Sequence, residues 1–230
     1  MKARSEPLNI LLTGGGGFIG SHVVDAYLRA GHRVTVVDNL STGKMANLNK
    51  RAQFFQEDIR SATLDTIVRQ FRFDVINHHA AHIDLRRSVT DPWHDAEVNI
   101  LGTLNVLECA CRYGIKRVIF AQTRDFVFVG DIVRANLLAL DYLTENSGHS
   151  DPLVVNVGTG QELSVNELFC LLKKFRSSVP EAIYAPPKPG EQRRSALDPS
   201  RAKRTLGWEP LVPIEIGLKE TWNWFRDGLR

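Results

Sequence analysis

Glycines near the start of the chain have the number and spacing to bind phosphate. Residues 13–20 read TGGGGFIG, so Gly14, Gly17 and Gly20 recur at every third position directly after an apolar run. Without a Cβ, glycine lets the chain turn sharply and bring its backbone against a pyrophosphate. A helix starting at Phe18 and Ile19 would point free N–H groups and its positive dipole end at the same phosphates. This strand–turn–helix context predicts a dinucleotide-binding turn rather than an ordinary glycine-rich connector.

Acidic residues follow the next two apolar runs and could complete such a site. Asp38 comes at the end of the second run, about 20 residues beyond the turn, where a carboxylate can accept both ribose hydroxyls. The same negative charge would repel a 2′-phosphate, so Asp38 favours NAD over NADP. Asp58 and Ile59 follow the third run, where they could border the adenine or simply form a surface turn.

The elements that must position these residues alternate between strand and helix signals through the first half of the chain. Strands are expected at 8–13, 33–37, 53–56, 74–77 and 117–121, and helices at 18–30, 62–71 and 91–114. This alternation predicts an α/β fold of the Rossmann type. Its doubly wound parallel sheet would have strand order 3-2-1-4-5 and helices on both faces.

The second half carries weaker strand signals and several helix signals. Helices are expected at 131–142, 164–175, 199–206 and 213–225, the second capped by Ser164 with Glu167 three residues on. A strand at 153–157 would rebuild a shortened far edge of the sheet. We therefore expect a dinucleotide-binding domain at residues 1–158 and a small C-terminal lobe at 159–230.

Composition excludes several classes of protein. The 230 residues carry 29 basic and 26 acidic side chains, so the net charge of +3 comes without a basic stripe, and a nucleic-acid binder is disfavoured. No apolar stretch approaches the length of a membrane span, and no signal-peptide core follows the first residue. The three cysteines have no disulfide or metal spacing and are expected to be small buried hydrophobes in a cytoplasmic protein.

Three histidines close in sequence raise the alternative of a metal site. His78, His79 and His82 lie at the end of the expected fourth strand. Neighbouring side chains on a strand point to opposite faces, so His78 and His79 would not converge on one ion. No metal is predicted.

Beyond the glycine turn, the sequence resembles the extended short-chain dehydrogenase/reductase family. The resemblance is to its NAD-dependent nucleotide-sugar epimerases and dehydratases, in particular those of the UDP-glucose 4-epimerase type. Matching segments run in family order from near the N-terminus to about residue 210. They are TGGGGFIGS at 13–21, VDNLSTGK at 37–44, DIR at 58–60, HAA at 79–81, SVTDP at 88–92, VNILGTLNVL at 98–107, VIFAQT at 118–123, RDFVFVGDIVRAN at 124–136, VNVGTG at 155–160 and PGE at 189–191.

The resemblance also implies a loss. In the family, the strand that ends near Thr123 leads into a helix with the catalytic Tyr-x-x-x-Lys, and further segments precede the Arg-Asp-Phe stretch. Here Arg124 follows Thr123 at once, so a segment the size of a subdomain is absent. The one tyrosine with a lysine four residues later is Tyr184, and two prolines before Lys188 exclude the helix that would put both side chains on one face.

Further site residues are implied by the resemblance alone. Asn39 would lie beside the cofactor, and the backbone of Ala80 and Ala81 would pass it. Thr123 matches the Ser/Thr that hydrogen-bonds the substrate hydroxyl. Lys188 occupies the place of an arginine that contacts the substrate diphosphate, where lysine is a point charge without the bidentate fork.

Two functions remain open at this point. The chain could be a weakly active epimerase acting on a UDP-sugar, or a non-catalytic NAD-binding protein with a binding or regulatory role. Family dimers commonly use two helices per subunit, and one of these lies in the absent segment. We therefore expect a weakened or rearranged homodimer.

Overall fold

The computed structural model describes residues 6–121, 125–146, 148, 151–175, 181–184 and 196–228, without the side chains of Leu85 and Arg86. The chain divides into two compact units, residues 1–122 and 123–230. This division by contacts falls earlier in the chain than the expected domain boundary at residue 158, which stays a prediction. Thr123 and Lys188 lie outside the described residues.

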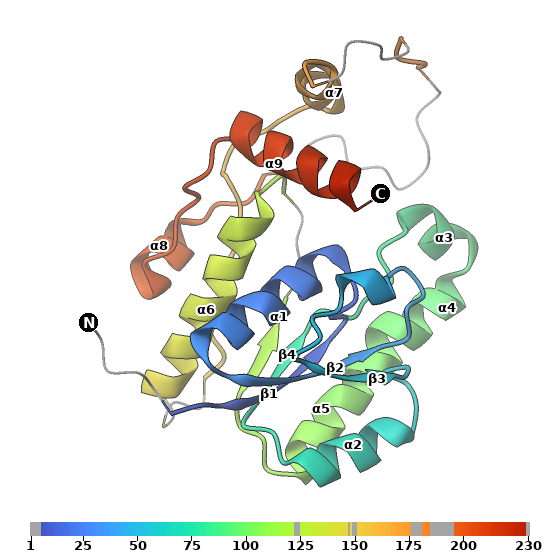
Figure 1. The fold of residues 1–230 in the computed structure, drawn as a ribbon, viewed down its shortest axis with the longest axis vertical. Coiled ribbons are helices and arrows are strands. Elements are labelled where there is room, and N and C mark those ends of the chain that lie inside the picture. The colour runs from blue at the N-terminus through green and yellow to red at the C-terminus, as the bar shows by residue number, and fades with distance from the viewer. Residues whose placement is uncertain are drawn as a thin grey trace. The chain divides into compact units, whose positions relative to one another are not determined.

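A five-stranded parallel sheet forms the centre of the first unit (Figure 1). Its strands are β1 (Asn9–Thr13), β2 (Arg33–Asp38), β3 (Gln53–Gln56), β4 (Val75–His78) and β5 (Val118–Phe120), in the order β3-β2-β1-β4-β5. The predicted α/β fold and strand order are confirmed. Thr13 is aligned with Val37 on one side and with His78 on the other, so the residues after these three strands leave the sheet at one edge.

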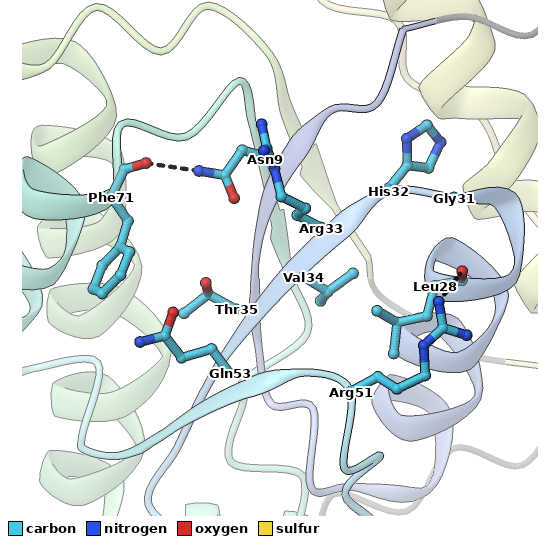
Figure 2. Close-up of a pocket in the computed structure, with 10 residues that line it drawn as sticks. All are labelled: Asn9, Leu28, Gly31, His32, Arg33, Val34, Thr35, Arg51, Gln53 and Phe71. Atoms are coloured by element: carbon cyan, nitrogen blue, oxygen red, sulfur yellow. Dashed lines mark hydrogen bonds between the residues drawn. The ribbon is translucent and has the colours of Figure 1, made fainter.

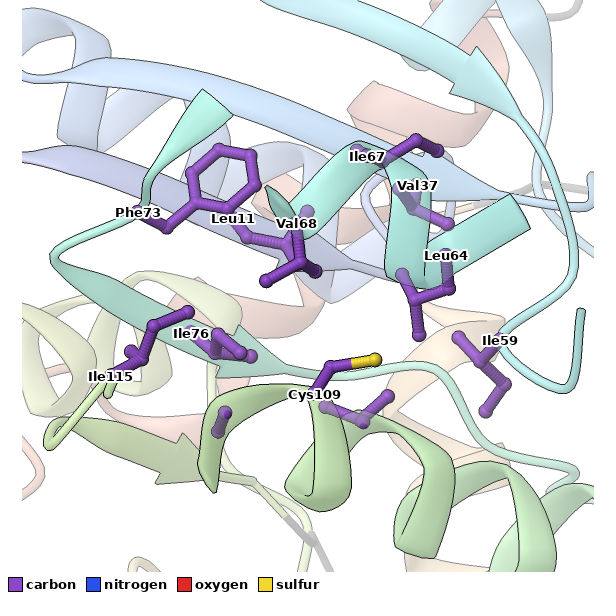
Figure 3. Close-up of a cluster of buried hydrophobic side chains, with 12 residues drawn as sticks. Leu11, Val37, Ile59, Leu64, Ile67, Val68, Phe73, Ile76, Cys109 and Ile115 are labelled. Atoms are coloured by element: carbon purple, nitrogen blue, oxygen red, sulfur yellow. The ribbon is translucent and has the colours of Figure 1, made fainter. Parts of the chain in front are cut away.

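Helices cover both faces of this sheet, as expected of parallel strands. Helix α1 (Phe18–Ala30) lies on one face, and α2 (Thr63–Phe71) and α5 (Thr103–Arg112) lie on the other. Strand residues alternate between the two faces. Leu11, Val37 and Ile76 point toward α2 and α5, where they meet Leu64 and Cys109 in one apolar cluster (Figure 3).

The helical segment before α5 is not uniform. A short α3 (Leu85–Thr90) and α4 (Pro92–Ala96) precede a π-helical turn, η2 (Glu97–Gly102), which continues into α5. Asp91 caps α4 by accepting a hydrogen bond from the His94 amide. The single helix expected at 91–114 is therefore a composite, because periodicity does not distinguish a π-turn from an α-helix. The remaining short element, η1 (Met45–Asn47), is a 3₁₀ turn.

The second unit is helical in its described part. It contains α6 (Val129–Glu145), α7 (Val165–Lys173), α8 (Ser200–Leu206) and α9 (Ile214–Asp227). The predicted capping box at the start of α7 is confirmed, with Ser164 and Glu167 each bonding the other's backbone N–H. Trp208 is fully buried and donates its indole N–H to the carbonyl of Asp131 at 2.8 Å.

The predicted strand at residues 153–157 was wrong. These residues form no strand in the structure, and Val155 and Val157 instead pack on a cluster formed by Ala135, Ala202 and Trp208. A run of β-branched residues signals burial as much as extended pairing. Contact with α6 and α8 satisfies that burial without a sheet ladder.

The expectation that all three cysteines are buried is confirmed for one of them. Cys109 is buried, whereas Cys111 and Cys170 are exposed. Among the described residues, none of the helices is both long enough and apolar enough to cross a membrane.

Candidate functional site

The glycine turn packs so tightly that side chains are excluded at two positions. Gly14 has φ +77°, and a Cβ there would lie 2.6 Å from the Ala80 amide nitrogen. A Cβ on Gly20 would lie 2.1 Å from the Gly14 carbonyl oxygen. The first contact presses the turn against the backbone that follows β4, and the second presses α1 onto the turn. The structure thus requires glycine at two of the three positions that the sequence pattern singled out.

The N-terminus of α1 is open beside this turn. Its N-cap residue is Gly17, which has no side chain to cap the helix, and the first turn contains no acidic residue. Among the described residues, the amides of Ile19 and Gly20 find no hydrogen-bond acceptor. Unpaired N–H groups at the positive end of a helix dipole form a binding site for an anion.

Asp38 lies at the end of β2, directly beside the turn. Its carboxylate is buried and accepts hydrogen bonds from the amides of Gly16 at 2.8 Å and Leu40 at 2.7 Å. Each oxygen therefore has one of these bonds and keeps acceptor capacity for a further hydroxyl donor. Leu40 adopts φ +58°, a conformation uncommon for leucine, to turn its amide toward Asp38.

Asp58, after β3, has a different environment. Its Oδ1 accepts from the amide and the Nε of Arg60, and its Oδ2 accepts from the Arg60 guanidinium and the Asn39 side chain. The hydrogen bond with Arg60 is the main cause that lowers the pKa of Asp58 to about 2, against the opposing effect of burial. Four donors occupy this carboxylate. Asp58 thus holds the loop together, and Asp38 has more capacity for a ligand.

The loop after β4 forms the third wall of the site. The Ala80 amide donates to the Thr13 hydroxyl at 3.3 Å, and the His79 amide donates to the Thr13 carbonyl at 3.0 Å. Ala80 is half-buried and Ala81 is exposed. The sequence-predicted residues of β1, α1, β2, β3 and β4 therefore gather at the carboxyl edge of the sheet, where open α/β sheets bind their ligands.

His78 connects this wall to α5 through two threonines. Its Nδ1 lies 2.6 Å from the Thr13 hydroxyl, and its Nε2 lies 3.1 Å from the Thr103 hydroxyl. Thr103 gives its only hydroxyl proton to the Asn99 carbonyl, so it must accept from His78. This places a proton on Nε2, and in the neutral imidazole Nδ1 then accepts from the Thr13 hydroxyl.

Burial supports this neutral state. It lowers the pKa of His78 to about 4, and the charge of the neighbouring His79 adds to the effect. Among the described residues no group of histidine, cysteine and carboxylate side chains has the arrangement of a metal site. Sequence reasoning did not identify the His78 pair of contacts, because Thr13 and Thr103 are distant in the chain and threonine has no distinctive spacing.

Comparison with known proteins gives the family. The sequence model described as the NAD dependent epimerase/dehydratase family matches residues 10–123. A protein of Methanocaldococcus jannaschii, provisionally assigned as a UDP-glucose 4-epimerase, is 31% identical over 312 residues, covering 96% of this chain and 99% of the relative. The chain belongs to the NAD-dependent epimerase/dehydratase family.

Solved structures of this family have the same fold. The UDP-glucose 4-epimerase of Thermotoga maritima, solved with UDP-glucose, has a TM-score of 0.86 and 32% identity, covering 97% of this chain and all of that one. The UDP-glucose 4-epimerase of Thermus thermophilus, solved in complex with NAD, has a TM-score of 0.85 and 28% identity, covering 95% of this chain and 99% of that one.

This epimerase/dehydratase family member is shorter than its relative from Methanocaldococcus jannaschii. The alignment of the two extends over 312 residues, but this chain has only 230. At least 82 aligned positions must therefore be occupied in the relative and empty here. Since nearly the whole of both chains is covered, most of this difference is internal.

A hollow lies at the opposite edge of the sheet, where the strands begin (Figure 2). Its volume is about 570 Å³, and it is lined by the first residues of three strands, Asn9, Arg33 and Gln53, together with Arg51 and Phe71. The side chain of Asn9 donates to the Phe71 carbonyl across it at 2.6 Å. None of the predicted site residues that the structure describes lines this hollow. The candidate site is therefore the carboxyl edge.

Proposed function

We propose that this chain is an NAD-binding protein of the nucleotide-sugar epimerase type whose catalytic half is incomplete. The observation that carries the proposal is the cradle at the carboxyl edge of the sheet. There the tight turn at Gly14 and the uncapped start of α1 lie beside the buried Asp38 carboxylate. A backbone anion site next to a carboxylate acceptor is the donor and acceptor set that a dinucleotide requires.

The residues present fit NAD part by part. The amides of Ile19 and Gly20 would take the pyrophosphate, and the unused lone pairs of Asp38 would take the ribose hydroxyls. Asp58 and Ile59, with Asn39 beside them, would border the adenine. The backbone at Ala80 and Ala81 would lie along the cofactor. NAD, when bound, would supply the acceptor for a hydride from the sugar.

The catalytic side of the site is where we propose the loss. None of the four tyrosines has a lysine four residues later on a helix, which the family's Tyr-x-x-x-Lys requires. Three observations support an internal deletion directly after Thr123. The family match ends at residue 123, the division of the chain into two compact units falls between residues 122 and 123, and the relative occupies at least 82 positions that this chain lacks.

What remains for a substrate is limited. The proposed ligand is a UDP-sugar, for which the family resemblance makes Thr123 the candidate contact of the sugar hydroxyl and Lys188 that of the diphosphate. Removal of a positioned general base costs about 10² to 10⁴ in rate. We therefore expect NAD binding to persist while turnover is weak or absent.

A coupled assay of UDP-galactose and UDP-glucose interconversion tests the catalytic part. The proposal predicts turnover at the background level of a mock preparation, with NAD added in excess. Turnover that survives repurification and disappears in Asp38→Ala and Thr123→Ala variants would instead establish a compact, active epimerase. An Asp141→Ala variant on the exposed part of α6 is the matched control, since it should change neither result.

The proposed assembly is a weakened or rearranged homodimer. Ile100, Leu104 and Leu107 are exposed and recur at intervals of four and three, which places them on one side of η2 and α5. Such an apolar stripe is typical of a protein interface. Light scattering over a concentration series should give a mass that rises from monomer toward dimer. A mass fixed at that of a dimer down to nanomolar concentration would contradict a weakened contact.

A further inference from the structure

The composite helix before and within α5 contacts both loops that flank the glycine turn. We call residues 57–61 the β3 loop and residues 79–84 the β4 loop. We propose that the π-turn η2 makes this helix a two-sided clamp, which positions each loop with its own set of residues. The inference rests on the proposed function in one respect, namely that these two loops are walls of an NAD site.

One set of contacts holds the β3 loop. Glu97 accepts from the Arg60 guanidinium at 3.0 Å, and Asn105 donates to the Ile59 carbonyl at 2.7 Å. Between them, Gly102 lies against Ile59 so closely that a Cβ would come within 2.6 Å of the Ile59 Cδ1. A salt bridge between partly exposed groups contributes little by itself, so Asn105 and the Ile59 packing supply most of this hold.

A second set holds the β4 loop. The Asn99 carboxamide accepts from the His82 amide at 2.7 Å and donates to the His82 carbonyl at 2.9 Å. Asp95, one α-helical turn earlier, fixes this carboxamide by accepting from it at 3.0 Å. Thr103 adds the contact with His78 at the start of the loop. Asn99 thus satisfies both backbone groups of one loop residue.

The π-turn allows the helix to make both sets of loop contacts at once. Glu97 and Asn105 are eight residues apart, and at about 100° per residue an α-helix would leave them about 80° apart. The extra residue of a π-turn makes their spacing equivalent to about seven residues, which is about 20° apart. Asn99 and Thr103, four residues apart, meanwhile stay aligned with each other on the opposite face, since each is two residues, or about 200°, from Glu97 or Asn105. One helix therefore contacts the two loops with two different sets of aligned residues.

This arrangement matters for the glycine turn because both loops touch the site. Gly14 lies against the His79 and Ala80 backbone, and Asn39 bonds the Asp58 carboxylate of the β3 loop. The composite helix therefore positions both the β3 loop and the β4 loop through contacts outside the glycine turn. A change in helix register would move one wall relative to the other.

Residue-resolved amide hydrogen exchange of the full chain without ligand tests the clamp. Glu97→Ala should speed exchange in the β3 loop by about 2- to 5-fold and leave the β4 loop unchanged. Asn99→Ala removes both hydrogen bonds to the His82 backbone and should speed exchange at the β4 loop by about 10-fold, with the β3 loop unchanged. Deletion of Ile100 should resemble Asn99→Ala. It keeps Glu97 aligned with Asn105 but rotates Asn99 about 60° away from Thr103.

The matched control is Ile100→Ala, which shortens the same exposed side chain without a change of register and should affect neither loop. The proposal is overturned if deletion of Ile100 leaves both loops protected, or loosens both equally. If the deletion variant does not fold, the two point variants decide, and equal effects of either one on both loops overturn the clamp. Because no ligand is present, this result is independent of whether NAD binds.

Discussion

At the scale of single residues, the site depends on glycines that have no Cβ as much as on polar side chains. Gly14 and Gly20 are required by contacts closer than any Cβ tolerates, and their spacing in the sequence predicted both. Asp38 was predicted from its place at the end of the second apolar run, which is β2. The sequence did not predict that the Asp58 carboxylate already accepts hydrogen bonds from Arg60 and Asn39, because these bonds depend on side-chain directions in two loops.

Gly20→Ala should disrupt the turn, since the new methyl group would lie 2.1 Å from the Gly14 carbonyl oxygen. Overpacking of this kind lowers the free energy of unfolding by at least about 1–3 kcal/mol. Urea denaturation measures the loss. Gly148→Ala, where nothing lies within 4 Å of the added Cβ, is the control and should change stability little. Equal urea midpoints for Gly20→Ala and Gly148→Ala would show that the turn accommodates the methyl group without loss of stability.

The buried imidazole of His78 predicts a pH dependence of stability. Its pKa is about 4 in the folded protein, against 6.5 for an unburied histidine, so the unfolded chain binds the additional proton between these values. The free energy of unfolding should therefore fall as the pH drops from 6.5 toward 4, by up to roughly 3 kcal/mol, and this contribution should level off below pH 4.

A His78→Gln variant provides the comparison for that prediction. Urea denaturation at intervals between about pH 7 and pH 4 should give a flatter dependence for the variant than for the parent protein. Parallel curves would mean that His78 is not the group responsible. The carboxyl of Asp58, whose pKa is lowered from 3.8 to about 2, loses most of its contribution below pH 4 and affects both proteins alike, so it cancels in the comparison.

At the scale of elements, sequence periodicity was sufficient for the sheet and for most helices. Buried β-branched runs indicated the strands, and caps such as Ser164 indicated helix ends. The same reasoning missed η2, since one extra residue in a helix leaves no signal in composition. It also placed a strand at residues 153–157, where the structure has helix packing in place of ladder hydrogen bonds.

The second unit offers a prediction at this scale. The buried Asp131 carboxylate of α6 accepts from the amides of Leu211 and Val212, and its carbonyl accepts from the Trp208 indole. Asp131→Ala removes the buried acceptor of two amides that lie on an exposed and a partly buried residue, which should destabilise the unit by about 1–3 kcal/mol in all. Tryptophan fluorescence during denaturation follows the exposure of Trp208, which is fully buried in the folded protein, on the background of the three other tryptophans. Asp141→Ala, on the exposed face of the same helix, should leave the transition in place.

At the scale of the whole molecule, the chain is a member of the epimerase/dehydratase family that is shorter than its relative by an internal length of sequence. The parallel sheet is complete from β3 to β5, and the family model stops matching where the first unit ends. The proposal that the missing length follows Thr123 comes from the sequence, because Arg124 succeeds Thr123 where the resemblance leads us to expect a further helix, and it stays a prediction. The effect of this shorter length on assembly and turnover depends on side-chain surfaces, which the periodicity of the sequence does not predict.

The central claim is that the nucleotide half of the site is intact. It is tested most directly by calorimetric titration of the purified chain with NAD, alongside NADP. We predict saturable binding of one NAD per chain. NADP should bind at least about tenfold more weakly, because its 2′-phosphate would meet the Asp38 carboxylate. No saturable heat up to millimolar NAD, or equal affinity for the two nucleotides, would contradict the account.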